Sequence, residues 1–226
     1  MSEWWTYGVS DFLMFSPRVY DRLLAATNAA LWPAHVGTIL LGLAAAGLAV
    51  SPLRAGARAA LLVLGPLWIV VAWVFLWQRY ATINWGMLYA APAFACQGLA
   101  MVVAGVLPVV EGRRPPEPAA IAAAVLAAAI VLGWPLLGLA AGRPLGTGET
   151  FGLFPDPTAL VTLAILASLR GGLRVVLMIV PLAWVLVATA TLYTLGAWTW
   201  IAVIAAAASA VALALIGPRR PSSRRS

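Results

Sequence analysis

The sequence has no lysine, one cysteine, one histidine and only seven acidic residues among 226. The single cysteine, Cys96, excludes an intrachain disulfide and any metal site built from several cysteines. No Ser–His pair with the spacing of a hydrolase and no cluster of metal ligands is present. We therefore expect no enzymatic activity and no cofactor, and an intramembrane enzyme is the weakest of the functions considered.

Charge is also missing from six long stretches, and every Arg, Asp and Glu lies between these stretches or at the two ends of the chain. A bilayer core of about 30 Å needs about 20 apolar residues in a helix. A charged side chain at its centre costs about 3 kcal/mol or more. The pattern predicts an all-α, multi-pass membrane protein with no soluble domain. The charge-free stretches are 23–53, 59–78, 80–110, 118–142, 157–169 and 175–218.

The excess of positive charge, +7 overall, comes entirely from arginine. The arginines lie beside the apolar stretches, where cytoplasmic loops of membrane proteins collect them. We therefore expect the bilayer itself and anionic lipid headgroups to be partners of the Arg-rich loops and of the basic tail 218–226, and we expect no nucleic acid. A homo-oligomer or a membrane-complex partner is also compatible with the sequence.

The number of spans depends on the short stretch 157–169, which reaches only about 20 Å as a helix. The chain has about seven transmembrane helices if this stretch crosses, and six if it is re-entrant. Counting arginines on the two sides does not separate these alternatives. An internal repeat favours seven, because residues 53–61 match residues 169–177 at five of nine positions with a constant offset of 116. Equivalent hairpins in parallel halves require the seven-span topology.

The repeat indicates a 3+1+3 arrangement of helices within one transmembrane domain, residues 1–217. In this scheme the amino-terminal segment lies along the membrane surface, and the chain ends in the cytoplasm with its amino terminus outside, in a bacterial inner membrane. The predicted parts are an interfacial segment 1–24, a first half 25–112, a linker helix 118–142, a second half 150–217 and the tail 218–226. The predicted spans are 29–50, 59–78, 86–109, 118–141, 155–170, 173–195 and 198–216.

Asp156 is the most suggestive polar residue, because Pro155 and Pro157 flank it just before a short helix. Asp before a helix is a normal N-cap, in which case its carboxylate lies in water. Alternatively, the helix begins below the membrane surface, and transporters use such half-helix ends as ligand sites. The predicted substrate-binding residues are Asn84, Gln97, Asp156 and Thr158. Polar groups in membrane helices also bond across helices, so Gln97 and Asn84 have a structural alternative.

His35 is the only histidine and follows Trp32 and Pro33 near the start of the first long apolar stretch. A hydrogen-bonded structural role is the simpler interpretation, because no second histidine is present for a bis-histidine haem site. His35 is nevertheless a candidate cofactor or proton site, since an unperturbed imidazole has a pKa of about 6.5.

Two segments, residues 28–34 and residues 150–158, resemble a bacterial integral-membrane family of unknown function, DUF 6064. The resemblance extends over most of the chain and implies a small multi-pass membrane protein without assigning an activity. It also implies a cysteine at the position of Asp156, where this chain departs from the family pattern. Separately, the 3+1+3 plan looks like the architecture of SWEET sugar transporters, an analogy of fold that does not establish function.

Two functions follow as hypotheses. The first is a small-solute transporter or channel-like protein with a site between the two halves. The alternative is a structural or accessory subunit of a larger membrane complex, in which the small residues of the last span would make packing contacts.

Overall fold

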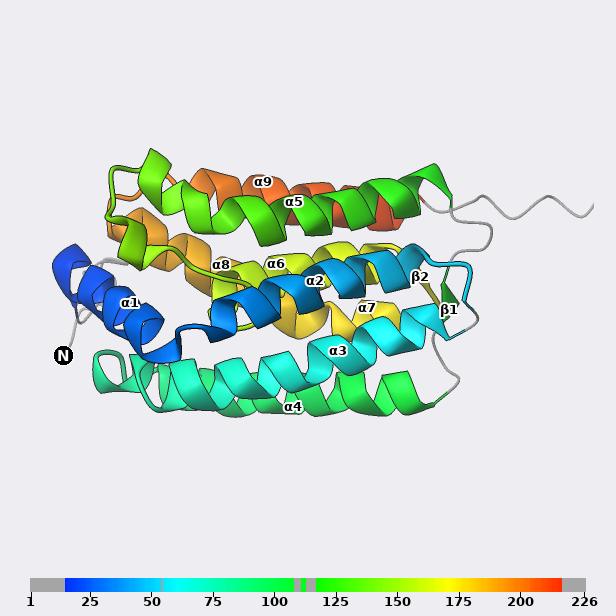
Figure 1. Ribbon diagram of the computed structural model, residues 1–226, viewed down its shortest axis with the longest axis horizontal. Helices are drawn as coiled ribbons and strands as arrows, with labels where there is room; N and C mark the ends of the chain where they lie inside the picture. The colour runs from blue at the N-terminus through cyan, green and yellow to red at the C-terminus, as the bar shows by residue number, and fades with distance from the viewer. Residues whose placement is uncertain (1–14, 54, 108–110, 113–116, 217–226) are drawn as a thin grey trace, which may run out of the picture.

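The computed structural model describes residues 15–53, 55–107, 111–112 and 117–216. Its long helices run side by side along one axis, and a shorter one crosses an end of the bundle (Figure 1). The α-helices are α1 Pro17–Leu31, α2 Ala34–Val50, α3 Gly56–Val70, α4 Met87–Val106, α5 Pro118–Ala140, α6 Pro155–Ala167, α7 Leu173–Leu177, α8 Ile179–Thr194 and α9 Trp200–Leu215. A π-helix, η3 Val71–Trp77, continues α3, and the 3₁₀ turns are η4 Tyr80–Thr82 and η5 Leu145–Thr147.

The all-α fold expected from the sequence is confirmed, and a helix lies in each of the predicted spans. Four helical segments are long and apolar enough to cross a membrane, namely Gly56–Thr82, Met87–Val106, Pro118–Ala140 and Leu173–Thr194. A fifth is added if the bent pair α1 and α2 counts as one span, whereas α6 and α9 are shorter apolar helices. These helices are consistent with a membrane location, and the predicted count of about seven spans is not confirmed.

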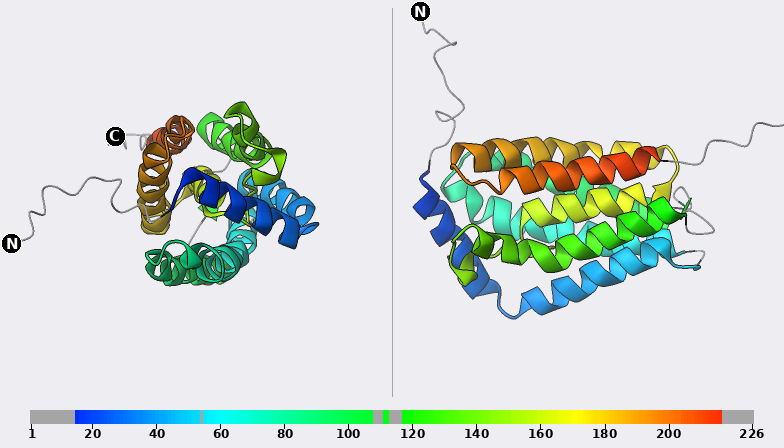
Figure 2. Two further views of the ribbon diagram at one scale, coloured as in Figure 1. Left: turned by 90° about the vertical axis from the view of Figure 1, so that its left-hand side faces the viewer. Right: turned by 90° about the horizontal axis from the view of Figure 1, so that it is seen from above.

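The first predicted span, 29–50, does not form one helix. Helix α1 ends at Leu31, α2 begins at Ala34, and the two axes differ by 90°. The break follows from Pro33, because a proline disfavours the helical conformation of the residue before it. Trp32 accordingly has an extended backbone, with φ −64° and ψ 133°. As a result, α1 crosses the end of the bundle (Figure 2).

Helix α6 lies at the centre of the molecule, where all 13 of its residues are buried. It packs against α5, α8 and α9, with smaller contacts to α2 and α3. Seen from above, α6 begins well inside the bundle, whereas α5 and α8 reach the end that carries α1 (Figure 2). The segment between α5 and α6 must therefore enter the bundle. In a membrane protein, non-helical backbone inside the bilayer core must be surrounded by protein or line a water-filled cavity, because lipid cannot form hydrogen bonds with it.

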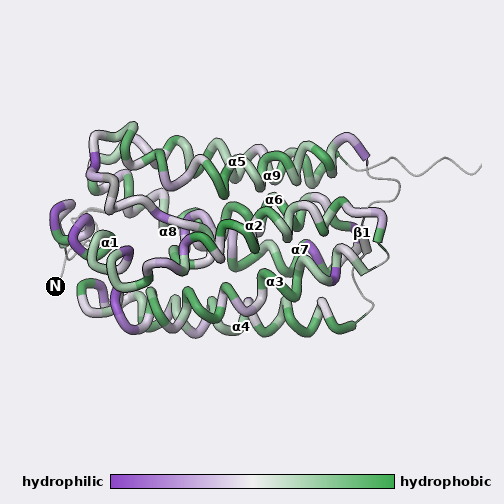
Figure 3. The backbone as a smooth tube through the Cα atoms, in the orientation of Figure 1, coloured by the Kyte–Doolittle hydropathy of each residue, from purple (hydrophilic) through white to green (hydrophobic). Residues whose placement is uncertain are grey.

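The two ends of the bundle differ. At one end, strand β1, Glu111–Gly112, pairs antiparallel with β2, Leu169–Arg170, and Arg170 forms an ion pair with Glu117. The other end carries α1 and the turn between α8 and α9 (Figure 1). Hydrophilic segments gather toward both ends, and the helices between them are mainly hydrophobic (Figure 3). The internal repeat and the division into halves stay predictions, and the tail 218–226 and residues 1–14 lie outside the described residues.

Candidate functional site

The segment that leads from α5 to α6 passes close to α5. At Gly148, an added Cβ would meet the carbonyl oxygen of Pro135 at 2.7 Å, which is closer than any side chain tolerates. Only glycine therefore permits this approach. The next residue, Glu149, is consequently carried into the bundle, where it is only 7% exposed.

A tight turn then reverses the chain into α6. Gly152 has φ +77°, a conformation that glycine adopts without strain. The hydroxyl of Thr158 accepts a hydrogen bond of 2.8 Å from the Gly152 N–H and donates one of 2.6 Å to the Phe154 carbonyl. Pro155 occupies the first position of α6, where its missing N–H costs nothing. This arrangement fixes Asp156 in the first turn, where the helix dipole favours a carboxylate.

Asp156 is buried, with 4% of its surface exposed, so it is not a cap that lies in water. The indole Nε1 of Trp184, on α8, donates a hydrogen bond of 2.8 Å to Oδ1 of Asp156. The ring of Trp184 packs edge-on against Phe94 on α4, with 5.0 Å between ring centroids. Phe94 in turn packs against Trp68 on α3 at 4.3 Å. This aromatic row holds the donor in place against the carboxylate.

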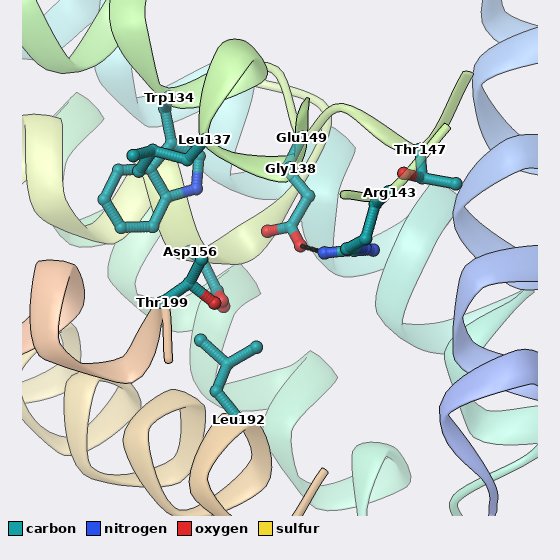
Figure 4. Close-up of a pocket in the computed structure, with 9 residues that line it drawn as sticks. All are labelled: Trp134, Leu137, Gly138, Arg143, Thr147, Glu149, Asp156, Leu192 and Thr199. Carbon is teal, nitrogen blue, oxygen red and sulfur yellow. Dashed lines mark ion pairs between the residues drawn. The ribbon is translucent and has the colours of Figure 1, made fainter. Parts of the chain in front are cut away.

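Glu149 faces the same space as Asp156, and Arg143 lies on its other side (Figure 4). The distance from Arg143 Nη1 to Glu149 Oε1 is 4.0 Å, the outer limit of an ion pair. Burial raises the pKa of Glu149 above its ordinary value, and the neighbouring carboxylate of Asp156 raises it further. Arg143 and the indole of Trp134 act in the opposite direction without cancelling the effect. The structure therefore favours a proton on Glu149.

These side chains line a cavity of about 20 Å³, drawn in Figure 4. A polar cavity of this size holds about one water molecule. It suits a proton or a water molecule and is far too small for a sugar. The lining residues are Trp134, Leu137, Gly138, Arg143, Thr147, Glu149, Asp156, Leu192 and Thr199. Among the described residues, no group of three or more His, Cys, Asp or Glu is placed to hold a metal ion.

Helix α1 fastens the loop that carries Glu149. The amide of Asn28 donates hydrogen bonds to the carbonyls of Gly146, at 2.7 Å, and Gly148, at 2.9 Å. His35 Nε2 lies 2.8 Å from Asn28 Oδ1. Because the amide nitrogen of Asn28 already donates, its oxygen accepts, and His35 carries its proton on Nε2 in this contact. His35 on α2 thus positions Asn28 on α1, and Asn28 holds the loop before α6.

Comparison with known families gives one match. The model of a family of unknown function, DUF6064, matches residues 18–225. The chain belongs to DUF6064. The family resemblance in the sequence is therefore confirmed, whereas no curated protein and no solved structure matches the chain. The analogy to SWEET transporters gains no support from these comparisons.

In this DUF6064 chain, the four predicted substrate-binding residues do not meet in one site. Only Asp156 lines the cavity, and Thr158 closes the turn before α6. Gln97 is buried and donates a hydrogen bond of 2.7 Å to the Leu177 carbonyl, where α7 gives way to α8. Asn84 accepts a hydrogen bond of 3.0 Å from the Gly86 N–H in the turn before α4. Their role in binding a substrate stays a prediction.

The residues that lie around Asp156 in the fold were not predicted from the sequence. Glu149 and Arg143 lie in a short polar stretch between two predicted spans, and Trp134 and Trp184 lie within apolar stretches that predict no binding role. One signal was present. Two of the seven acidic residues, Glu149 and Asp156, lie seven positions apart and precede the shortest apolar stretch. His35, the other predicted site residue, lies beside Asn28 and does not line the cavity, so its role as a cofactor or proton site stays a prediction.

Proposed function

We propose that this DUF6064 protein is a bacterial inner-membrane protein of the transporter or channel-like type that moves protons, with Glu149 and Asp156 as the groups that carry them. One observation carries the proposal: two buried carboxylates face a single cavity with room for about one water molecule. Ionisable groups inside membrane proteins are costly and mark ion paths and proton relays.

The chemistry of the pair supports a proton as the transported species. Two carboxylates in one buried site do not readily carry two negative charges, so one of them retains a proton near neutral pH. The Trp184 indole stabilises negative charge on Asp156, and the raised pKa of Glu149 makes it the better proton holder. The pair is therefore asymmetric, and a proton can pass between two unequal sites.

The polar side chains of the buried helix α6 also support the proposal. The helix is buried on every side, yet it carries Asp156 in its first turn, Thr158 and Thr162 further along, and Ser168 directly after its last residue. In the proposed orientation, the amino terminus and the carboxylate pair lie toward the outside. The opposite end of the bundle, which carries β1, β2 and Arg170, then faces the cytoplasm and its anionic lipids.

The test is proton flux in proteoliposomes of zwitterionic lipid that enclose a pH-sensitive dye, with a membrane potential imposed. We expect the wild-type protein to acidify the lumen. We expect Glu149→Gln and Asp156→Asn to reduce the rate to that of protein-free vesicles. Glu117→Gln is the matched control, since it makes the same chemical change at the far end of the bundle. Flux that survives in both variants, or is absent from the wild type, contradicts the proposal.

The alternative, an accessory subunit of a larger membrane complex, predicts a different outcome. It expects no flux from the wild-type protein alone, and it expects Asp156→Asn to leave the assembly of the complex intact. Ala210 and Ala214 are buried in the bundle. Substitutions at exposed small residues of α9, such as Ala208 and Ala212, would then disturb assembly instead.

A further inference from the structure

A second cavity lies next to the carboxylate pair, at the end of the bundle that carries α1. Its volume is about 200 Å³, so it is about ten times larger than the cavity at the pair. It lies between the start of α1, the end of α5 and the turn from α8 to α9. We call it the vestibule. Its lining residues are Pro17, Tyr20, Asp21, Ala141, Arg143, Leu192, Leu195, Gly196, Ala197 and Trp198.

Two side chains line both cavities, Arg143 and Leu192. They therefore form the partition between the vestibule and the carboxylate pair. Figure 4 shows Arg143 and Leu192 at the edge of the small cavity, with Arg143 directly beside Glu149. A long, flexible arginine can move without a change of the backbone, so it is the movable part of the partition.

The position of Arg143 is set by α1. Its Nε donates a hydrogen bond of 2.8 Å to Oδ1 of Asp21, and its guanidinium carbon lies 5.9 Å from the centre of the Tyr20 ring. Its Nη1 reaches Glu149 only at 4.0 Å. Its Nη2 is buried and has no hydrogen-bond partner among the described residues. Asp21 is thus the main group that holds Arg143 in place.

Helix α1 itself is anchored at both ends. Near its start, Tyr20 and Phe15 pack on the ring of Tyr80, each with 5.7 Å between ring centroids. Near its end, Asn28 is bonded to two carbonyls of the loop before α6. Opening the partition by lifting α1 would break all of these contacts. Releasing the side chain of Arg143 breaks only its ion pair with Asp21 and its longer contacts with Glu149 and the Tyr20 ring.

We propose that the vestibule is the entrance through which protons reach the carboxylate pair, and that the Asp21–Arg143 ion pair is the gate of this entrance. This inference rests on the proposed function, because it assigns the access route to the same site. Asp21 acts as a positioning residue, since it holds Arg143 across the entrance and does not itself line the small cavity.

The gate is tested by the chemical accessibility of the small cavity. Thr199 lines that cavity and is buried, so Thr199→Cys places a thiol behind the partition. The background is Cys96→Ala, which removes the native thiol. The measured quantity is the rate at which Ag⁺, a thiol reagent close in size to a water molecule, modifies the introduced thiol. We expect Asp21→Asn to raise this rate about two- to fivefold, the effect of losing a partly exposed ion pair.

Two controls separate the gate from a general effect on α1. Asp21→Glu keeps the carboxylate, and Arg22→Gln changes the charge of the adjacent, exposed residue on the same helix. We expect both to leave the rate near that of the parent. Because Asp21→Asn could loosen the whole helix, Leu192→Ala provides a second opening of the partition without altering an ion pair, and it should also raise the rate.

The outcomes distinguish this inference from the proposed function. An unchanged modification rate in Asp21→Asn overturns the gate, whatever the proton flux and whatever the rate in Leu192→Ala. A raised rate together with no proton flux in the wild-type protein keeps the gate as an access route and overturns proton transport. A raised rate together with faster flux through Asp21→Asn supports both.

Discussion

The indole Nε1 of Trp184 donates a hydrogen bond of 2.8 Å to Oδ1 of Asp156, which ties α8 to the first turn of the buried helix α6. A buried carboxylate that loses its hydrogen-bond donor destabilises the folded state, because its oxygen is then left unsatisfied. We therefore expect Trp184→Phe, which keeps an aromatic ring, to lower the free energy of unfolding by about 1–3 kcal/mol. Thermal unfolding in detergent micelles measures this.

Trp73→Phe is the control for that substitution, because Trp73 is 57% exposed and lies on the outer face of η3. We expect it to leave the unfolding midpoint almost unchanged. Equal midpoints for the two variants would show that the bond between Trp184 and Asp156 contributes nothing to stability.

The turn before α6 requires glycine at position 152. Gly152 has φ +77°, and an added Cβ would lie 3.2 Å from side-chain atoms of Leu67 and Thr38. We expect Gly152→Ala to destabilise the protein by about 1–2 kcal/mol through backbone strain alone. Gly133→Ala is the matched control in α5, where an added Cβ meets nothing within 4 Å. It should be neutral or stabilising by up to about 1 kcal/mol. Similar unfolding midpoints for both variants contradict the prediction.

Asn28 fastens the loop that carries Glu149 through hydrogen bonds to Gly146 and Gly148. We expect Asn28→Ala to cost about 1–3 kcal/mol of local stability, because two carbonyls lose their donor. Hydrogen exchange should then speed up in the loop before α6 and stay unchanged at the far end of α4. Ala29→Ser, at the exposed neighbouring position, is the control. Protection of the loop that survives Asn28→Ala would show that other contacts hold it.

The helices could be predicted from the sequence because charge-free stretches report directly on burial and membrane contact. For this reason α5 falls close to the predicted span 118–141, and α7 and α8 together fall close to the predicted span 173–195. The break at Pro33 was missed because one proline within a long apolar stretch is compatible with either a kink or a new direction. The direction that α1 takes at this break depends on the groups that α1 packs against, namely Tyr80 and the loop before α6.

The candidate site could be predicted only in part. Asp156 was identified from its flanking prolines, but its burial depends on the loop that enters the bundle. Glu149 and Arg143 lie in a polar stretch that periodicity cannot place. They come together with Asp156 because Gly148 packs on Pro135 and because α1 covers that end of the bundle. Such contacts between distant segments are not encoded in any local pattern.

The raised pKa of Glu149 makes stability depend on pH. Because the folded protein binds a proton that the unfolded chain releases near the ordinary pKa of 4.5, this residue stabilises the fold fully below that pH. The contribution declines as pH rises and is lost once pH passes the raised pKa of the folded state. We expect the unfolding midpoint of the wild type to fall as pH rises through neutrality. We expect Glu149→Gln to flatten this fall, and an unaltered pH profile in the variant contradicts the assignment.

The central claim is that the buried pair holds a proton on Glu149 near neutral pH. Infrared difference spectroscopy of the protein in lipid, with the Glu149→Gln variant as the reference, tests it most directly. The account predicts a carbonyl band of a protonated carboxylic acid at neutral pH that is absent from the variant and that disappears as the wild type is titrated to alkaline pH. A spectrum that shows Glu149 ionised at neutral pH, with no such band, would contradict it.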